Sequence, residues 1–337
     1  MNSVAIIGAG ITGLTAAFRL KQRGVPVTVY EASGRAGGVI QSIRQNGYLA
    51  ECGPNSCLET SPKIAELIRD LGLEKRKLYT DPASESRYLV RGGKPIEMPG
   101  SAVGFFKTPM FSVGAKSRLF AEPFISKSPA DVEETVAQFV KRRLGQEFLD
   151  YAINPLVAGV YAGDPARLSV KHAFPKLHAL EQKYGSLILG QFLGARERKR
   201  RKEVSKQDAK KFSFDEGLQV FTDELAAKIG SDLHLRCAVT HVRQTSEGWV
   251  VTSKTEQGET EREHSAVLFA APAYRFKDIN LAAETMVDAQ LLTQVAYPPV
   301  TSIVMGFRHE DIEHSCSGFG ALIPEVEGFN ILGVIFS

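Results

Sequence analysis

Three glycines and one glutamate near the N-terminus have the spacing of a dinucleotide-binding fingerprint. Gly8, Gly10 and Gly13 lie in one short segment, and Glu31 lies 23 positions after Gly8. In this fingerprint the glycines permit a tight turn, a close approach of the backbone to a pyrophosphate, and packing of a helix on a strand; the acidic side chain accepts hydrogen bonds from a ribose. A glycine-rich turn without a ligand is the alternative. The remaining turn residues, which we assign to the same predicted cofactor site, are Ala9, Ile11 and Thr12.

A second glycine-rich turn follows and carries a cation. Ala32 comes directly after Glu31, and Arg35, Gly37 and Gly38 close the segment. A guanidinium can pair with a phosphate, and a turn of this kind can offer backbone N–H groups to an anion. We therefore add Ala32, Arg35 and Gly38 to the predicted cofactor site. An ordinary loop turn at the two glycines is the alternative.

The elements around these residues predict a βαβ unit. Val4–Ile7 is a continuous apolar run, a helical pattern follows through Leu20, and residues 25–30 are rich in β-branched side chains. Two parallel strands joined by a helix are typical of the start of an α/β nucleotide-binding domain. The chain has 337 residues, which predicts about two domains.

The middle of the chain is predicted to be mostly helical. Asp131 and Glu134 have the spacing of a capping box before a helical pattern, and a second pattern runs over residues 147–153. Residues 99–129 show no clear period and are predicted to be irregular. A later helix is expected over residues 218–229. Strands are expected over residues 87–90, 94–98, 233–236, 239–243, 249–253, 267–270, 301–307, 321–324 and 332–336.

The pattern resembles the amine-oxidase-like flavoproteins and, within them, the protoporphyrinogen oxidases. The glycine fingerprint, Glu31 and the Arg-x-Gly-Gly segment at residues 35–38 are typical of the flavin-binding start of that superfamily. Residues 159–165, which read Gly-Val-Tyr-Ala-Gly-Asp-Pro, and Phe174 with Pro175 are similar to a segment of the protoporphyrinogen oxidases. The resemblance runs from residue 1 to residue 337 and implies that FAD is the cofactor.

The resemblance also implies further site residues. Val239 lies in a segment that contacts the flavin, although on the sequence alone it is a core residue of an expected strand. Arg87 matches the family position that grips a substrate propionate, with a solvent-facing arginine as the alternative. Gly163 lies in the segment that lines the substrate cavity, and its alternative is a simple turn. The other residues implied to contact the flavin are Val39, Gly53, Pro54, Asn55 and Ser56.

The implied activity is FAD-dependent oxidation of protoporphyrinogen IX to protoporphyrin IX with dioxygen as the acceptor, in haem and porphyrin biosynthesis. Hydride transfer from this apolar macrocycle to flavin N5 requires orientation and a dry pocket more than a side-chain acid. We therefore assign no catalytic side chain. Oxidation of coproporphyrinogen III to coproporphyrin III, or the reaction of another amine-oxidase-like flavoprotein, is the enzymatic alternative.

The implied fold is α/β, with a FAD-binding Rossmann-like domain, an inserted mostly helical domain and a mixed-sheet substrate domain. We place the FAD-binding βαβ part at residues 1–84 and a helical insertion facing substrate and membrane at 85–205. The chain is expected to return to the FAD-binding domain at 206–280 and to start the substrate-domain sheet at 281–337. Family members continue beyond the position of Ser337, so we expect a chain truncated at its C-terminus; an inactive truncated binding module is the non-catalytic alternative.

Composition and charge argue against other classes of protein. Lys and Arg number 41 against 38 for Asp and Glu, which is too balanced for nucleic-acid binding to be the main activity. The seven histidines show no metal-ligand spacing and the four cysteines are scattered, so no metal site is predicted. Reduced thiols of this kind are typical of a cytoplasmic protein.

A basic run and several phenylalanines predict a surface contact. Residues 196–202 contain six basic residues interrupted by Glu197, and phenylalanines are frequent between residues 105 and 124. Such a combination favours a peripheral contact with the inner face of the cell membrane. Porphyrinogen and dioxygen are the expected small-molecule partners, and a homodimer is the expected assembly.

Overall fold

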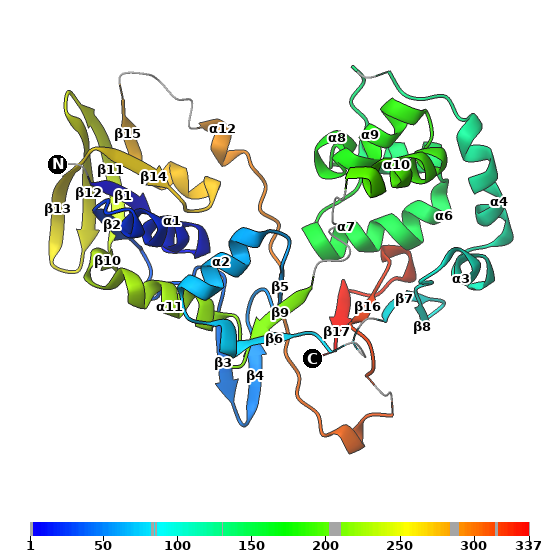
Figure 1. The fold of residues 1–337 in the computed structure, drawn as a ribbon, viewed down its shortest axis with the longest axis horizontal. Coiled ribbons are helices and arrows are strands. Elements are labelled where there is room, and N and C mark those ends of the chain that lie inside the picture. The colour runs from blue at the N-terminus through cyan, green and yellow to red at the C-terminus, as the bar shows by residue number, and fades with distance from the viewer. Residues whose placement is uncertain are drawn as a thin grey trace. The chain divides into compact units, whose positions relative to one another are not determined.

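A computed structural model describes residues 3–81, 84, 86–129, 131–201, 210–283, 290–313 and 316–336. The chain divides into two compact units, which are drawn in Figure 1. The first unit contains Met1–Thr80, Lys206–Tyr297 and Thr301–Gly306. The second contains Asp81–Ser205, Pro298–Val300 and Phe307–Ser337.

A parallel sheet of four strands is at the centre of the first unit. Its order is β10-β2-β1-β14, so strands from both halves of the sequence flank β1. The predicted βαβ unit is confirmed, because α1 connects β1 to β2. The strands are β1 (Val4–Ile7), β2 (Val27–Tyr30), β10 (Leu233–His234) and β14 (Ala266–Phe269), and the connecting helix is α1 (Ile11–Gln22).

Both faces of this parallel sheet are covered. Ile6 packs into a core with α1 and α11, whereas Ala5 and Ile7 pack into a second core with an antiparallel sheet. A strand buried on both faces has no polar side, which explains why β1 is a continuous apolar run rather than an alternating one. Helix α11 (Gln219–Ile229) buries Phe221 and Leu225 in the first of these cores.

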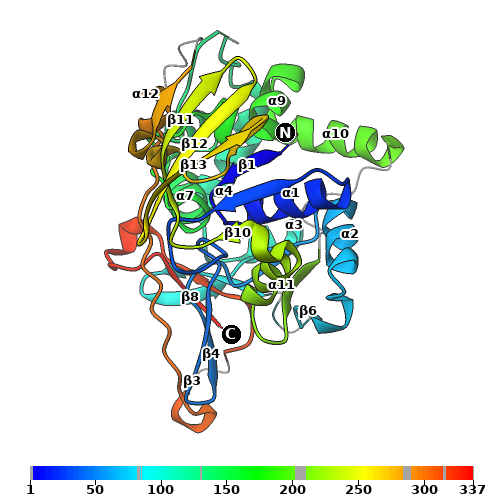
Figure 2. The same cartoon turned by 90° about the vertical axis from the view of Figure 1, so that its left-hand side faces the viewer.

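The antiparallel sheet has the order β13-β12-β11-β15, with β15 parallel to β11. Figure 2 labels its strands β11, β12 and β13. The strands expected over residues 239–243 and 249–253 are confirmed as β11 and β12, but β13 and β15 are missing from the sequence-based prediction. Strand β15 has only three residues. Strand β13 reads Gly-Glu-Thr-Glu-Arg-Glu-His and exposes all residues but the last, so no apolar alternation marks it. The strands are β11 (Ala238–Thr245), β12 (Gly248–Thr255), β13 (Gly258–His264) and β15 (Asn280–Ala282).

Smaller elements complete the first unit. Strands β3 (Ser42–Gln45) and β4 (Tyr48–Glu51) form a hairpin, and a three-stranded antiparallel sheet has the order β5-β9-β6. Helix α2 is capped by the Ser61 side chain, which accepts the Lys63 N–H. The bounds are β5 (Cys57–Leu58), β6 (Lys77–Tyr79), β9 (Lys211–Phe214), α2 (Pro62–Asp70) and α12 (Gln290–Thr293), with 3-10 turns at Glu74–Arg76, Gly230–Asp232 and Ala273–Asp278.

The second unit combines a mixed sheet with short helices. The sheet order is β17-β16-β7-β8, and only the β16–β7 pair is parallel. The strands are β7 (Arg87–Arg91), β8 (Lys94–Glu97), β16 (Gly320–Leu322) and β17 (Gly333–Ile335). The helices are α3 (Ala102–Lys107), α4 (Val113–Ala121), α5 (Val136–Arg143), α6 (Gln146–Phe148), α7 (Asn154–Tyr161), α8 (Val170–Ala173), α9 (Pro175–Tyr184) and α10 (Leu187–Arg201). There is also a π-helical turn at Leu149–Ile153 and 3-10 turns at Glu122–Phe124, His309–Asp311 and Glu325–Glu327.

Two sequence-based predictions for the second unit are wrong. Residues 99–129 are not irregular but contain α3 and α4, which have six and nine residues and are too short to show a repeated apolar stripe. The capping box is not Asp131 with Glu134. Instead, the Thr135 hydroxyl accepts the Gln138 N–H at 3.2 Å and the Gln138 side chain accepts the Thr135 N–H at 2.9 Å, so α5 starts at Val136.

The strand expected over residues 301–307 is also wrong, since these residues join none of the sheets in the described part of the chain. The segment is exposed, and Ile303 has 76% of its surface accessible. Apolar residues alone do not make a strand, because a strand also needs a hydrogen-bonding neighbour. The later strands expected near residues 321 and 332 are confirmed as β16 and β17.

Candidate cofactor site

The glycine turn lies between the end of β1 and the start of α1. A β-carbon on Gly13 would overlap the Gly8 carbonyl oxygen, so only glycine lets the helix pack this closely on the turn. A β-carbon on Gly10, by contrast, would meet nothing within 4 Å. The first turn of α1 has no acidic residue. The structure therefore presents an open backbone surface at a helix N-terminus, where a phosphate fits.

Glu31 follows β2, and its carboxylate is directed at the same turn. One oxygen accepts the Ala9 N–H at 2.8 Å, and the other accepts the Ser33 N–H at 2.8 Å. A carboxylate has about four acceptor positions, so two remain for ribose hydroxyls. The two hydrogen bonds fix the orientation of the carboxylate before any ligand binds.

The second glycine-rich turn packs on the first one. The Gly37 N–H donates to the Ala9 carbonyl at 2.8 Å. The Arg35 guanidinium donates to the carbonyl oxygens of Ala36 at 3.1 Å and Ile40 at 3.0 Å, and also to that of Gly38. Arg35 thus holds its own loop together, and its predicted role as a phosphate ligand stays a prediction. Ala32 lies in the loop between Glu31 and these residues.

The segment expected under the flavin lies beside this loop. A β-carbon on Gly53 would overlap the Val39 carbonyl oxygen, so the two backbones are in direct contact. Val39 itself is 78% exposed, although it is apolar. Pro54 is exposed, whereas Asn55 and Ser56 are half-buried. The structure therefore brings the residues near 8–13, 31–39 and 53 into one continuous surface.

Val239 lies on β11 and is buried in the core of the antiparallel sheet. The Cys237 N–H donates to the Glu31 carbonyl at 2.8 Å, so the start of β11 lies beside the end of β2. Whether Val239 contacts the cofactor stays a prediction.

The sequence analysis did not identify three residues that contact the glycine-rich turns. The Ala271 nitrogen lies 3.0 Å from the position of a Gly8 β-carbon, and the Thr222 hydroxyl lies 2.9 Å from that of Gly37. The Arg236 guanidinium lies 3.3 Å from the corresponding position of Gly34. Ala271 could have been found, because it follows the carboxyl end of a parallel strand, where α/β folds bind their ligands.

A buried polar pair anchors the strand that carries Glu31. The Tyr30 hydroxyl and His264 Nε2 are 2.9 Å apart, and His264 Nδ1 lies 3.1 Å from the Ser3 hydroxyl. Burial raises the pKa of Tyr30 to about 12. Burial, together with the positive charge of Arg262, lowers the pKa of His264 below its usual value. Both side chains are therefore neutral near pH 7.

Arg87 and Gly163 belong to the second unit. Arg87 starts β7 with its side chain exposed, and within the described part of the chain its guanidinium has no hydrogen bond or ion pair. Gly163 follows the end of α7, and a β-carbon there would lie 3.1 Å from a Leu168 methyl carbon. The geometry leaves Arg87 available to an anionic ligand and makes Gly163 a tightly packed position.

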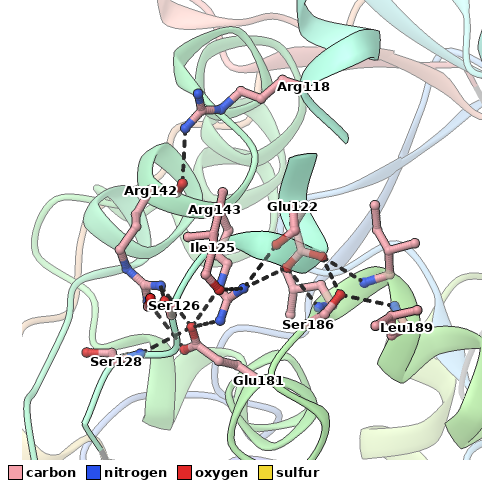
Figure 3. Close-up of polar contacts among 12 residues, drawn as sticks. Arg118, Glu122, Ile125, Ser126, Ser128, Arg142, Arg143, Glu181, Ser186 and Leu189 are labelled. Carbon is pink, nitrogen blue, oxygen red and sulfur yellow. Dashed lines mark hydrogen bonds and ion pairs between the residues drawn. The ribbon is translucent and has the colours of Figure 1, made fainter. Parts of the chain in front are cut away.

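A buried ion network connects the helices of the second unit (Figure 3). The Arg143 guanidinium lies between the carboxylates of Glu122 and Glu181, and all three side chains are fully buried. Glu122 also accepts the Leu187 N–H at 2.9 Å at the start of α10. Arg142 joins the network through Glu134 and Glu181. The network holds α5, α9, α10 and the turn at Glu122–Phe124 together.

The basic run lies at the end of α10. Residues 196–201 are part of this helix, but their side chains are not described, and Lys202 lies outside the described residues. None of the helices in the described ranges is long and apolar enough to cross a membrane. The same ranges contain no cluster of three or more potential metal ligands.

Comparison with known proteins agrees with the geometry of this site. A model of the family described as flavin containing amine oxidoreductase matches residues 11–337. The chain therefore belongs to the flavin-containing amine oxidoreductase family, its fold is the α/β fold of that family, and its cofactor is FAD. The open glycine turn and the oriented Glu31 carboxylate fit the pyrophosphate and ribose of this cofactor.

Within the family the chain is similar to porphyrinogen oxidases. It is 35% identical to protoporphyrinogen oxidase 2 of Arabidopsis thaliana, with 99% of this chain and 70% of the relative covered. It is 31% identical to coproporphyrinogen III oxidase of Staphylococcus aureus, with 98% of this chain and 72% of the relative covered. A crystal structure of the "Putative protoporphyrinogen oxidase" of Exiguobacterium sp. 255-15 has a TM-score of 0.73 at 20% identity, covering 98% of this chain and 72% of that one.

Proposed function

We propose that the protein oxidises protoporphyrinogen IX to protoporphyrin IX, with FAD as cofactor and dioxygen as acceptor, in haem and porphyrin biosynthesis. The observation that carries the proposal is the 35% identity with a plant protoporphyrinogen oxidase over 99% of this chain. The coproporphyrinogen III reaction is the second candidate, because the Staphylococcus aureus relative acts on that substrate by name and also covers 98% of this chain.

The chain's own residues supply binding and orientation. The N-terminus of α1 and the open backbone at Gly10 receive the pyrophosphate, and Glu31 holds the ribose. When bound, FAD would supply the hydride acceptor, with dioxygen as the final electron acceptor. Arg87 offers a planar guanidinium that matches a propionate carboxylate in two hydrogen bonds. Orientation of this kind accounts for a large part of the barrier reduction in transfers between two bound reactants.

The experiment that tests this function is an absorbance spectrum of the purified protein, followed by anaerobic addition of protoporphyrinogen IX. We expect flavin bands that bleach on addition, with porphyrin fluorescence appearing at the same time. A parallel addition of coproporphyrinogen III ranks the two substrates by kcat/KM. Bound flavin that neither porphyrinogen bleaches would reject both reactions and leave another amine-oxidase-like substrate; protein that binds no FAD would support the inactive binding module.

We also propose a peripheral contact with the inner face of the cell membrane, for a protein otherwise located in the cytoplasm. Phe106 of α3 and Phe120 of α4 stack with ring centroids 5.9 Å apart, and Phe120 is 68% exposed. Phe124, in the following turn, is 88% exposed. Exposed aromatic side chains with lysines nearby, here Lys107 and Lys127, favour the interfacial region of an anionic bilayer.

Sedimentation with lipid vesicles tests the membrane contact. We expect binding to vesicles that contain phosphatidylglycerol, weaker binding to pure phosphatidylcholine, and loss of binding in a Phe120→Ser, Phe124→Ser double variant. Equal recovery with and without vesicles would reject the proposal. We also propose a homodimer, which light scattering of lipid-free samples tests; the mass of a single chain would reject it.

A further inference from the structure

The Glu51 carboxylate connects two elements that are far apart in the sequence. One oxygen accepts the Leu218 N–H at 2.8 Å, and the other accepts the Ser42 hydroxyl at 2.6 Å. Leu218 immediately precedes α11, whereas Ser42 and Glu51 are opposite each other on β3 and β4. One side chain thus joins the start of α11 to the base of the β3–β4 hairpin. Both strands of this hairpin are labelled in Figure 2.

The connection is reciprocal. The Gln219 N–H donates to the Ser42 hydroxyl at 3.1 Å, and the Gln219 side-chain oxygen accepts the Ser42 N–H at 2.9 Å. Three hydrogen bonds therefore hold Ser42 and Glu51 against Leu218 and Gln219 at the start of the helix, and a fourth joins Ser42 to Glu51 within the hairpin. The Ser42 hydroxyl and N–H, both Glu51 carboxylate oxygens and the Gln219 side-chain oxygen all have partners. A network whose members are satisfied in this way favours a single arrangement.

The packing leaves no space for a different side chain beside this cluster. Gly217 has a φ angle of +88°, and a β-carbon there would lie 2.6 Å from a Glu51 carboxylate oxygen and would overlap the Ser42 hydroxyl. A glycine is therefore required both for the backbone conformation and for the approach of Glu51. Gly217 thus allows the close approach between the start of α11 and the β3–β4 hairpin that the Glu51 hydrogen bonds require.

The cluster lies directly before the segment expected under the flavin. The Cys52 N–H donates to the Gln41 carbonyl at 2.8 Å, and the next residue, Gly53, touches the Val39 carbonyl. Glu51 is therefore two residues from Gly53 and is held by a helix that also contacts the loop at Gly37 through Thr222. A displacement of Glu51 would move both backbones that form the surface around Val39.

We propose that Glu51 is a positioning residue for the cofactor: through Leu218 and Ser42 it fixes the segment Gly53–Ser56 and so determines the environment of the bound flavin. The inference rests on the FAD site described above and on the expectation that this segment lies under the flavin ring. It does not depend on which substrate the enzyme oxidises.

The test compares Glu51→Gln with wild type in FAD titrations that need no substrate. The neutral amide keeps only one acceptor oxygen, so one of the two part-buried donors, the Leu218 N–H or the Ser42 hydroxyl, loses its acceptor, and the other loses the charge of its partner. We expect FAD to bind about tenfold more weakly, and the visible absorption bands of the bound flavin to shift at saturating FAD. Glu224→Gln is the matched control, because this carboxylate is on α11 and, among the described residues, forms an ion pair only with Lys228, at 3.4 Å.

A purely structural Glu51 predicts a different result. In that case Glu51→Gln would lower the midpoint of thermal unfolding but leave the bound-flavin spectrum and the FAD affinity of the folded variant at wild-type values. That outcome overturns the proposal. If Glu51→Gln does not fold, Ser42→Ala is the second variant, since it retains the hydrogen bond from Leu218. A smaller spectral shift in Ser42→Ala supports the proposal, whereas an unchanged spectrum rejects it. Failure to oxidise porphyrinogens, with FAD binding as expected, would reject the proposed function alone.

Discussion

At the scale of single residues, Glu31 has the most direct connection to the cofactor. Its carboxylate already accepts two backbone N–H groups from the glycine turn and its own loop, at 2.8 Å each. These bonds align the carboxylate without help from a ligand, so FAD does not have to order it on binding. Preorganisation of this kind increases affinity by reducing the entropy lost on binding.

We therefore expect Glu31→Ala to weaken FAD binding by about tenfold to a hundredfold, because the ribose loses a charged acceptor and two backbone donors lose theirs. Quenching of FAD fluorescence on titration measures the effect. Glu247→Ala, at an exposed turn, is the control. Equal affinities in the two variants would show that the Glu31 carboxylate does not contact FAD.

His264 gives a prediction for pH dependence. It is buried and faces Ser3 and Tyr30, with Arg262 as the charged neighbour, and burial and Arg262 lower its pKa below 6.5. The unfolded chain therefore binds a proton more readily than the folded one, and stability is lost as the pH falls through 6.5. We expect the midpoint of thermal unfolding to decrease between pH 7.5 and about 5.5, and to decrease less in His264→Gln.

His234 is the appropriate control for that measurement. Its pKa is also lowered, by burial and by Arg262, but it is less buried than His264. A His234→Gln variant that flattened the pH profile as much as His264→Gln would contradict the assignment to the buried residue.

At the scale of elements, the buried ion network determines how the helices of the second unit are held together. Burial alone would raise the pKa of Glu181, but hydrogen bonds from Arg142 and Arg143 outweigh it and keep this pKa below its usual value. The network therefore stabilises the fold above the ordinary glutamate pKa, near 4.5, and this contribution is lost as the pH falls further.

Arg143→Met is expected to destabilise the second unit by about 3–5 kcal/mol, because two buried carboxylates lose a shared partner. Chemical denaturation followed by circular dichroism measures the change. Arg76→Met is the matched control: its ion pairs with Asp215 and Glu216 are on the surface, where such pairs contribute about 0–1 kcal/mol. Similar losses in both variants would mean that the buried network adds no particular stability.

Elements differ in how well their sequences predict them. The β1–α1–β2 unit is predictable because its apolar run, glycines and helical stripe are local. The start of α5 is not, since Asp131 and Glu134 have the spacing of a capping box but Thr135 and Gln138 make the hydrogen bonds. Helices α3 and α4 were missed because they are too short for a periodic stripe, although Ser101 and Ser112 cap them.

At the scale of the whole molecule, the family and the cofactor were predictable, because the motif residues of the fingerprint and residues 159–165 are contiguous. The surroundings of the cofactor were not. Thr222 contacts the turn at Gly37, and Glu51 binds the residue before α11. No sequence spacing indicates either contact, because both depend on how distant elements pack.

Binding of FAD should also stabilise the molecule by mass action. A ligand that binds only the folded state at 100 times its dissociation constant adds about 2.7 kcal/mol. We expect the thermal midpoint to rise steadily with FAD concentration and to fall when the flavin is removed by dialysis against potassium bromide. Riboflavin, which lacks the adenosine and pyrophosphate recognised by the glycine turn and Glu31, is the control and should shift the midpoint less.

The pairing of β1 with β14 has a consequence for protein synthesis. Val4 pairs with Ala266 in the sheet, so the wall behind the glycine turn cannot form until the residues of β14 have left the ribosome. Until then the βαβ unit has an unpaired strand edge and an apolar face without its cover, and pairings between such distant segments form slowly. We therefore expect cofactor capture to follow the synthesis of β14, more than two hundred residues after the glycine turn itself.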